Sequence, residues 1–501
     1  MEKQFDILTN NIIYINEVSE NKHDRAPLLD AMMKYRDSKS VPFDVPGHKF
    51  GRGAADLAGI YGEEILALDF NSMKCLDILS NPVSVIKEAE ALLADAYGGD
   101  HGFFVVNGTS AAVRSMIMAV CKPGEKIIVP RNAHKSAISG LIMSGAMPVY
   151  VQPEYDKSLG LFHGMDTDFV KKAIDENPDA KAVFVINPTY YGAVSDLREI
   201  VDYAHDRNMA VIVDEAHGAH LKFHGDLPPS AMEAGADIAS ISTHKTGGSM
   251  SQSSVIVSRE GMVSASRIRS CLNMNGTTSS SYILMGSIDS ARRNLALRGE
   301  EIFDRILELC RWARDEINKL DGFYAFGKEI KGLPGVYDFD ETKLVVNTCG
   351  IGMTGFELYD LLRDEYNIQL ELGDTYNVLA IISLGDSWHQ LSRLVEALKD
   401  ISSRKYGIKK VVNHLKDVGE LECRMTPRDA YYSNTETVAF RESAGRISCE
   451  SIMAYPPGIP IVIPGEVITE NVIEYALFLK ENNALITDIE DNGLESIKVA
   501  L

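Results

Sequence analysis

Apolar and polar residues recur in two patterns along this chain. Between about residues 100 and 260, short runs rich in β-branched and aromatic residues are separated by longer stretches with helical periodicity. This alternation is typical of an α/β fold, in which helices cover a mixed, mainly parallel sheet. The expected strands are 103–106, 126–129, 148–151, 182–186, 210–213, 238–242 and 254–257.

The same patterns divide the 501 residues into four expected parts, since the chain is longer than one usual domain. Residues 1–45 form an arm with one helix at 27–36, and 46–290 form the large domain, which ends in a helical stretch at 281–298. Residues 291–405 read as a smaller α/β domain. Its expected helices are 300–320 and 355–364, and its strands 343–347 and 379–383.

Residues 406–501 are expected to form a C-terminal domain. A charged stretch at 403–410 leads into it, and Tyr-Pro-Pro-Gly-Ile-Pro stands at 455–460. Proline has no backbone N–H and clashes with the preceding turn, so this second stretch cannot lie inside a helix.

Composition narrows the range of partners and locations. The formal net charge of -21 disfavours nucleic acid, which needs clustered lysine and arginine. The acidity would attract a cationic ligand, but solubility alone explains it at least as well. The seven cysteines are scattered and never form a C-x-x-C pair, as expected in a reducing cytoplasm. No apolar run reaches 18 residues, and the first residues lack the order of a signal peptide. We expect a cytoplasmic protein without a membrane partner.

Lys245 stands in a run that suits a phosphorylated aldehyde cofactor. The sequence Ser-Thr-His-Lys-Thr-Gly-Gly at 242–248 follows an apolar stretch at 236–241. A lysine amine can hold an aldehyde as a Schiff base, while Ser242 and His244 could bind the phosphate. The run points to pyridoxal 5'-phosphate if the rest of such a site exists.

A second turn offers further phosphate ligands. Asn-Gly-Thr-Ser at 107–110 lies between the strand at 103–106 and a helical run at 111–120. Backbone N–H groups and the hydroxyls of Thr109 and Ser110 would face an anion at that helix N-terminus. Ordinary N-capping explains the same residues equally well.

Asp214 is the strongest companion of the lysine. It ends an apolar strand, where a carboxylate is costly unless it meets a cation, and a protonated pyridine nitrogen is such a cation. Ala216 is small enough to let a ring lie close. His217 could contact the phenolic oxygen of the cofactor or the carboxylate of the substrate, and His217 or Lys245 could return a proton to Cα.

The remaining histidines allow two interpretations. His134, after the strand at 126–129, could stack on the cofactor ring, although a lone loop histidine is more often an ordinary polar residue. His217, His220 and His224 have a spacing that could suggest a metal site. No carboxylate or cysteine completes a set at the usual zinc spacing, so no metal is expected.

These motifs, in this order, resemble the bacterial Orn/Lys/Arg decarboxylase family, whose fold is that of the aspartate aminotransferase superfamily. The resemblance covers nearly the whole chain, from Pro-Gly-His-Lys at 46–49 to Pro-Gly-Glu at 464–466. The motifs between them stand at 107–110, 131–136, 214–218, 242–245, 276–279, 340–344 and 455–460.

The resemblance implies a role for each matching residue. Lys245 would form the Schiff base, Asp214 would pair with the pyridinium, and His134 would stack on the ring. The implied phosphate ligands are Thr109, Ser110, Ser242 and His244. In that family, the segment matching 276–279 reaches the phosphate of the neighbouring subunit. Thr277 would then act in trans, and the active site would require a homodimer.

Two departures refine this expectation. Large inducible members carry an additional N-terminal receiver-like domain, whereas only a short arm precedes Pro46, so decameric assembly is not expected. An oligomer higher than the dimer stays open as an alternative. Thr-Gly-Gly-Ser at 246–249 resembles the shorter biosynthetic arginine decarboxylases, whose product agmatine feeds polyamine and spermidine synthesis. The expected reaction is therefore conversion of L-arginine to agmatine and carbon dioxide.

Alternatives stay open at this point. Lysine or ornithine could replace arginine as substrate, and the acidic partner of the substrate's far cation could be Glu442 or Glu466, either of which could equally be a surface residue. An aminotransferase or aldolase would keep Lys245 and Asp214. An aminotransferase usually needs an arginine for the α-carboxylate, and none can be assigned. A non-catalytic protein is disfavoured, because residues costly for stability alone are all present.

Overall fold

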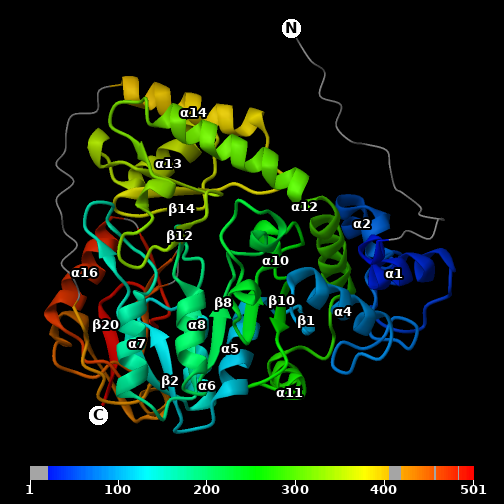
Figure 1. Cartoon of the computed structure of the whole chain (residues 1–501), viewed down its shortest axis with the longest axis horizontal. Helices are drawn as coiled ribbons and strands as arrows, with labels where there is room; N and C mark the ends of the chain where they lie inside the picture. Colours follow the sequence, from blue (N-terminus) through cyan, green and yellow to red (C-terminus); the bar gives the residue numbers. More distant parts are fainter. Residues whose placement is uncertain (1–20, 405–418, 456–458, 483) are drawn as a thin grey trace.

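A seven-stranded sheet forms the centre of the molecule (Figure 1). The computed structural model describes residues 21–404, 419–455, 459–482 and 484–501. The strand order is β1-β10-β9-β8-β6-β2-β3. Strands β3, β2, β6, β8 and β9 are parallel, and β10 is antiparallel to both β9 and β1. The strands are β1 (His101–Val105), β2 (Lys126–Pro130), β3 (Met147–Val151), β6 (Ala182–Ile186), β8 (Ala210–Asp214), β9 (Ile238–Ile241) and β10 (Ser254–Ser258).

All seven strands expected from the sequence are confirmed, as is the mixed, mainly parallel α/β fold. Alternate residues of each strand face opposite sides of the sheet, so each side has its own apolar layer. In β6, Val183 and Val185 join one buried cluster and Phe184 joins the other. The first cluster includes residues of α4 (Val85–Tyr97), α7 (Thr167–Glu176) and α8 (Leu197–His205), and the second includes residues of α5 (Gly108–Val120), α6 (Lys135–Ser144) and α11 (Ala265–Asn275).

One long helix, α12 (Tyr282–Ile317), replaces the two helices expected at 281–298 and 300–320. The expected break was wrong because Gly299 lies inside the helix without ending it. A Cβ atom added at Gly299 would come within 2.6 Å of Cβ of Phe223, so tight packing requires the glycine there. The expected domain boundary at 290 falls within α12, and the division into domains stays a prediction.

Beyond α12 lies the small unit, which we define as the elements between residues 324 and 403 (Figure 1). Its four-stranded sheet has the order β11-β13-β15-β14. The expected strands and the helix at 355–364 are confirmed in this unit. The elements are β11 (Tyr324–Ala325), β12 (Asp338–Phe339), β13 (Lys343–Asn347), α13 (Gly355–Tyr366), β14 (Leu372–Gly373), β15 (Asn377–Ile381) and α14 (Trp388–Ser403).

The C-terminal unit, from residue 419 onwards, surrounds a separate apolar cluster. Most of the charged stretch at 403–410 lies outside the described residues, as do Pro456, Pro457 and Gly458. One strand ends before these three residues and another begins after them, and for the three residues themselves the expectation stays a prediction. The elements are α15 (Pro427–Tyr432), β16 (Thr435–Ala439), β17 (Ile452–Tyr455), β18 (Ile459–Val462), α16 (Glu470–Glu481), β19 (Leu485–Thr487) and β20 (Ser496–Ala500).

At the other end of the chain, the expected helix at 27–36 is confirmed as α1 (Pro27–Asp37), which packs against α12 and α4. Two short helices follow, α2 (Ala55–Tyr61) and α3 (Glu63–Leu66). Within the described ranges, none of the helices combines the length and apolar character needed to cross a bilayer.

Candidate active site

The carboxyl ends of the parallel strands bring the predicted site residues to one edge of the central sheet. Asp214 is the last residue of β8, and Lys245 lies in the short helix α10 (Thr243–Thr246) directly after β9. His134 follows β2 and begins α6. This edge is where open α/β sheets place their ligands.

Lys245 lies against two aromatic side chains. Its Nζ atom is 2.6 Å from Nε2 of His217 and 5.4 Å from the centre of the Tyr190 ring. Burial lowers the pKa of Lys245, and the negative charges of Asp214 and Glu371 oppose this shift. A lysine whose amine is more readily neutral is a better nucleophile towards an aldehyde.

Asp214 is buried at the end of β8, and one of its carboxylate oxygens accepts a hydrogen bond of 3.1 Å from the backbone N–H of Ala216. Burial raises its pKa to about 6, and the charge of Lys245 opposes the rise. No lysine or arginine of the described ranges lies within ion-pair distance of this carboxylate. A buried carboxylate in this setting suits a cationic ligand group such as a protonated ring nitrogen.

Two buried nitrogen atoms near Asp214 lack hydrogen-bond partners. They are Nδ1 of His217 and Nδ2 of Asn187, whose backbone N–H donates to the carbonyl of Asp214 at 3.0 Å. Buried polar atoms are normally paired, so these atoms fit a site that receives polar groups of a bound cofactor. Sequence reasoning missed Asn187, although Asn-Pro-Thr-Tyr at 187–190 directly follows β6.

The expected phosphate ligands come together in part. Oγ1 of Thr109 lies 2.5 Å from Oγ of Ser242 and 2.8 Å from Oγ of Ser254. These three buried hydroxyls join the first turn of α5 to the residue after β9 and to the start of β10, and Ser254 was not predicted. Ser110 lies in the first turn of α5, where free backbone N–H groups attract anions.

His244 and His134 are expected to be uncharged, and each forms a hydrogen bond within the chain. Nδ1 of His244 donates to the carbonyl of Ser253 at 2.8 Å, and burial lowers its pKa. His134 accepts a hydrogen bond from the backbone N–H of Ser136 at the start of α6. Burial, with the charge of Lys245, lowers the pKa of His134 to about 4. Its stacking on a cofactor ring stays a prediction.

Thr277 is exposed on the segment after α11. Its backbone N–H donates at 3.1 Å to Oδ1 of Asn107, the residue that precedes α5 in the same chain. The contact places Thr277 beside the phosphate candidates of its own chain. Its action in a neighbouring subunit stays a prediction.

His217, His220 and His224 contact different residues. His217 contacts Lys245, His220 contacts Thr246 and Asp340, and His224 contacts Asp304. Across the part of the chain that the structure describes, no three histidine, cysteine or carboxylate side chains are placed to share a metal ion.

A fully buried ion pair of the small unit contacts the loop that carries His217. Nζ of Lys343 donates to Oδ2 of Asp340 at 2.7 Å and to the carbonyl of His217 at 3.2 Å. Asp340 also contacts Nε2 of His220 at 3.2 Å. Both charged residues belong to the motif at 340–344, which therefore positions the loop that carries His217.

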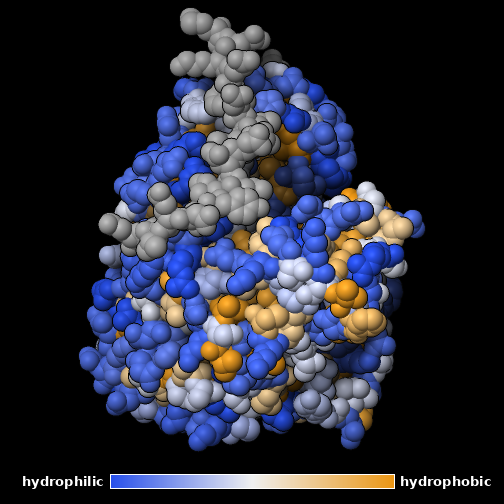
Figure 2. Space-filling model, turned by 90° about the vertical axis from the view of Figure 1, so that its right-hand side faces the viewer, coloured by the Kyte–Doolittle hydropathy of each residue, from blue (hydrophilic) through white to orange (hydrophobic). Residues whose placement is uncertain are grey.

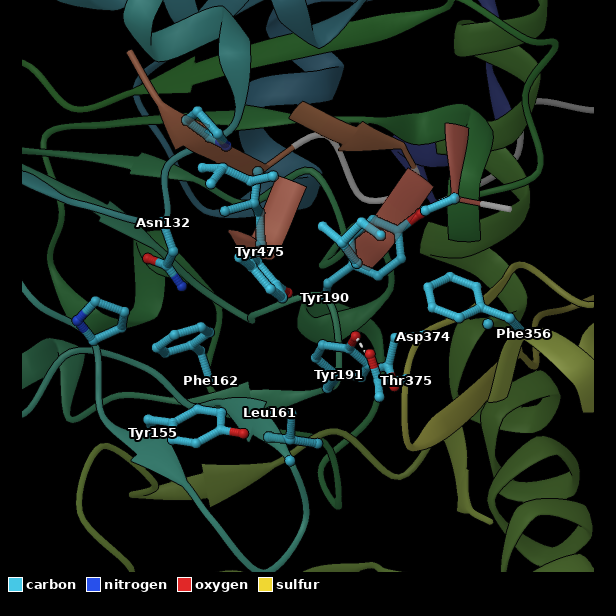
Figure 3. Close-up of a pocket in the computed structure, with 18 of the residues that line it drawn as sticks. Asn132, Tyr155, Leu161, Phe162, Tyr190, Tyr191, Phe356, Asp374, Thr375 and Tyr475 are labelled. Atoms are coloured by element: carbon cyan, nitrogen blue, oxygen red, sulfur yellow. Dashed lines mark hydrogen bonds between the residues drawn. The ribbon is translucent and has the colours of Figure 1, made fainter. Parts of the chain in front are cut away.

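An aromatic cavity of about 570 Å³ lies beside this centre, with Tyr190 in its wall (Figure 3). The hydroxyl of Tyr191 donates to Oδ2 of Asp374 at 2.5 Å, and burial raises the pKa of both groups. Rings from all three parts of the chain line the cavity, namely Tyr155, Phe162, Tyr190, Tyr191, Phe356 and Tyr475.

Glu466 and Glu442, the two residues expected as candidates to bind the cationic end of the substrate, lie in different surroundings. Glu466 is only 1% exposed, and both of its carboxylate oxygens accept from Arg131, at 2.6 and 2.7 Å. This pair joins the C-terminal unit to the end of β2. Glu442 is exposed at the end of a short 3₁₀ turn (Phe440–Glu442) in the C-terminal unit. A different carboxylate, Glu371, accepts a hydrogen bond from the hydroxyl of Tyr190 beside the lysine.

Comparison with solved structures agrees with this architecture. The constitutive lysine decarboxylase of Escherichia coli matches with a TM-score of 0.80 at 22% identity, over 95% of this chain and 82% of that chain. A ureidoglycine-glyoxylate aminotransferase from Bacillus subtilis matches with a TM-score of 0.52 at 15% identity, over 66% of this chain and 88% of that chain. These likenesses confirm the aminotransferase-like α/β fold.

Sequence comparison identifies the family. Residues 26–390 match the major domain of Orn/Lys/Arg decarboxylases, and residues 409–487 match their C-terminal domain. The arginine decarboxylase of Bacillus subtilis (strain 168) is 45% identical, over 94% of this chain and 97% of that protein. That of Bacillus anthracis is 42% identical, over the same shares of both proteins. The chain therefore belongs to the Orn/Lys/Arg decarboxylase family of amino-acid decarboxylases.

Proposed function

We propose that this protein uses pyridoxal 5'-phosphate to convert L-arginine to agmatine and carbon dioxide. Relatives at 42–45% identity over nearly the whole chain are named arginine decarboxylase. The observation that carries the cofactor proposal is the placement of Lys245 at one edge of the sheet with the buried Asp214, which forms no ion pair with any described lysine or arginine. Agmatine would then feed polyamine biosynthesis in the cytoplasm.

Each residue of the site has a distinct part in this proposal. The amine of Lys245 would hold the aldehyde carbon, and Asp214 would face the ring nitrogen, with Ala216 and the stacked His134 on either side of the ring. When bound, the cofactor ring accepts the electron pair of the bond to the departing carboxylate. The phosphate ligands would be Thr109, Ser110, Ser242, His244 and, from a neighbouring subunit, Thr277.

The pair of Lys245 and His217 would return a proton to Cα of the product. Their nitrogen atoms are 2.6 Å apart, so a proton on either one is shared with the other. Burial and the charge of Lys245 hold the pKa of His217 well below its usual range, which keeps the imidazole neutral and able to accept. The ring of Tyr190, whose centre lies 4.4 Å from that of His217, would shield the pair from water that competes for the proton.

We further propose that the protein is a homodimer. Val41, Phe43 and Val45 are 76%, 94% and 58% exposed, and Ile60 of α2 is 77% exposed. Figure 2 looks at the side of the molecule that carries α1 and α2, where apolar residues are grouped among polar ones. An exposed apolar patch of this kind favours burial against a second copy, which would also bring Thr277 to another subunit.

The purified protein loaded with pyridoxal 5'-phosphate tests the proposal directly. We expect a long-wavelength absorbance band of lysine-bound cofactor, which the Lys245→Ala variant lacks. Arginine, lysine and ornithine are then supplied separately, and the amine and carbon dioxide are identified by mass spectrometry. Agmatine from arginine is the expected product. Absence of carbon dioxide from all three amino acids would refute decarboxylation, and cadaverine or putrescine as the main amine would refute arginine as the substrate.

A further inference from the structure

We propose that Glu371, held in place by Tyr190, binds the cationic end of the substrate side chain and selects arginine. This inference rests on the proposed function and deepens it, since neither Glu442 nor Glu466 is placed to bind that group. Glu371 lies in the small unit, immediately before β14. It therefore reaches Tyr190 from a different part of the chain.

Tyr190 connects the lysine centre with this carboxylate. Its ring lies 5.4 Å from Nζ of Lys245, and its centre is 4.4 Å from the centre of the His217 ring. Its hydroxyl, at the other end of the side chain, donates to Oε1 of Glu371. The separation between the reacting centre and the carboxylate is thus spanned by one tyrosine side chain.

Glu371 differs from the other acidic candidates in having a place beside the lysine centre and no cationic partner of its own among the described residues. In the described ranges, no lysine or arginine forms an ion pair with it, whereas Glu466 is paired with Arg131. Asp374 is already bound by the hydroxyl of Tyr191 and by the backbone N–H groups of residues 376 and 377. The negative charge of Glu371 also opposes the lowering of the pKa of Lys245 and of His244 by burial.

The length and shape of arginine suit this arrangement. A substrate with its Cα beside Lys245 must extend its side chain along Tyr190 to bring a cation to Glu371. The guanidinium can rest on the aromatic face and donate two parallel hydrogen bonds to one carboxylate. The ammonium of lysine is a single point charge, and ornithine is shorter still. The geometry therefore favours arginine over lysine, and lysine over ornithine.

The Glu371→Gln substitution removes the charge with little change of shape, and it is tested in the full-length, cofactor-loaded protein. We expect kcat/KM for arginine to fall at least 100-fold, and the Kd for agmatine, measured by calorimetry, to rise at least 10-fold. Discrimination between arginine and its uncharged analogue citrulline should fall to within a few-fold. The absorbance band of the lysine-bound cofactor should persist.

Two further variants separate recognition from folding. Tyr190→Phe keeps the carboxylate and the ring but removes the hydrogen bond, so agmatine should bind about fivefold to tenfold more weakly. Glu396→Gln, on the exposed face of α14, serves as the matched control and should leave both constants unchanged. Glu371→Gln with constants for arginine and agmatine within twofold of the parent protein would overturn the inference.

Failure of the inference is distinct from failure of the proposed function. If the parent protein decarboxylates arginine and Glu371→Gln does so equally well, only the role of Glu371 is refuted. If the parent protein releases no carbon dioxide from arginine, but binds agmatine in a manner that requires Glu371, the inference stands and the proposed reaction fails.

Discussion

Nζ of Lys245 and Nε2 of His217 lie 2.6 Å apart in the interior of the site. Burial lowers the pKa of both groups, and the charge of Lys245 lowers that of His217 further. Two basic nitrogens in contact cannot both be charged at low cost, so the pair titrates as a unit. This coupling gives the site one mobile proton close to the position proposed for the substrate's Cα.

Replacement of His217 should therefore slow turnover without preventing cofactor binding. For His217→Ala we expect kcat for arginine to fall about 100-fold or more, because general acid–base residues typically contribute about 10²–10⁴-fold. Stopped-flow and steady-state assays measure the loss, and the cofactor absorbance band should remain. His224→Ala is the control, since His224 contacts Asp304 outside the site. Activity within twofold of the parent protein would exclude His217 from proton transfer.

Asp214→Asn should stabilise the cofactor-free protein at neutral pH while abolishing turnover. The pKa of Asp214 is about 6 in the folded protein, above its ordinary value of 3.8, so the folded state holds a proton that the unfolded state releases. The parent protein should therefore lose stability relative to the variant as pH rises from about 4 to above 6. A shift of this size corresponds to about 3 kcal/mol at most.

Urea denaturation of both cofactor-free proteins between pH 4 and pH 8 measures this difference. Asp179→Asn, at an exposed ion pair with Lys126, is a control for a carboxylate outside the site. A difference in stability that stays constant over this pH range would contradict the burial argument for Asp214.

The ion pair of Lys343 and Asp340 should be a main support of the site. Both side chains are fully buried, so Lys343→Met leaves an uncompensated carboxylate and should cost about 3–5 kcal/mol of unfolding free energy. The double variant with Asp340→Asn should recover part of this loss. Lys319→Met, at an exposed pair with Glu316, should change stability by about 0–1 kcal/mol. Equal effects of the two lysine substitutions in denaturation experiments would refute the assignment.

Phe43→Asp tests the proposed dimer. Phe43 is 94% exposed in the single chain, and a carboxylate at this position would be costly to bury against a second copy. Sedimentation velocity should show a dimer for the parent protein and a shift towards monomer for the variant. Phe169→Asp, on the exposed side of α7, should leave the assembly unchanged. A monomeric parent protein, or a variant that dimerises equally well, would contradict the proposal.

Local patterns predicted the central sheet because each strand carries its own apolar run and ends in a turn. They also predicted that Asp214 and Lys245 meet at one edge, since the carboxyl ends of parallel strands share that edge. The continuity of α12 was missed because it depends on the packing of Gly299 against Phe223. That contact joins residues distant in sequence and leaves no local pattern.

The same reason explains the errors at the far end of the site. Glu466 seemed free for a substrate, but Arg131, 335 residues earlier in the chain, pairs with it. The contact between Tyr190 and Glu371 spans 181 residues. Neither pairing can be read from spacing along the chain, whereas motifs of four to seven adjacent residues can.

Lys343 holds the carbonyl of His217 from the small unit, and Asp340 of the same unit holds His220. A hinge movement of the small unit away from the sheet would take these partners from the carbonyl of His217 and the imidazole of His220, both of which are buried, at a cost in free energy. The lysine and the aspartate of one motif thus oppose separation of the small unit from the loop that carries His217 and His220.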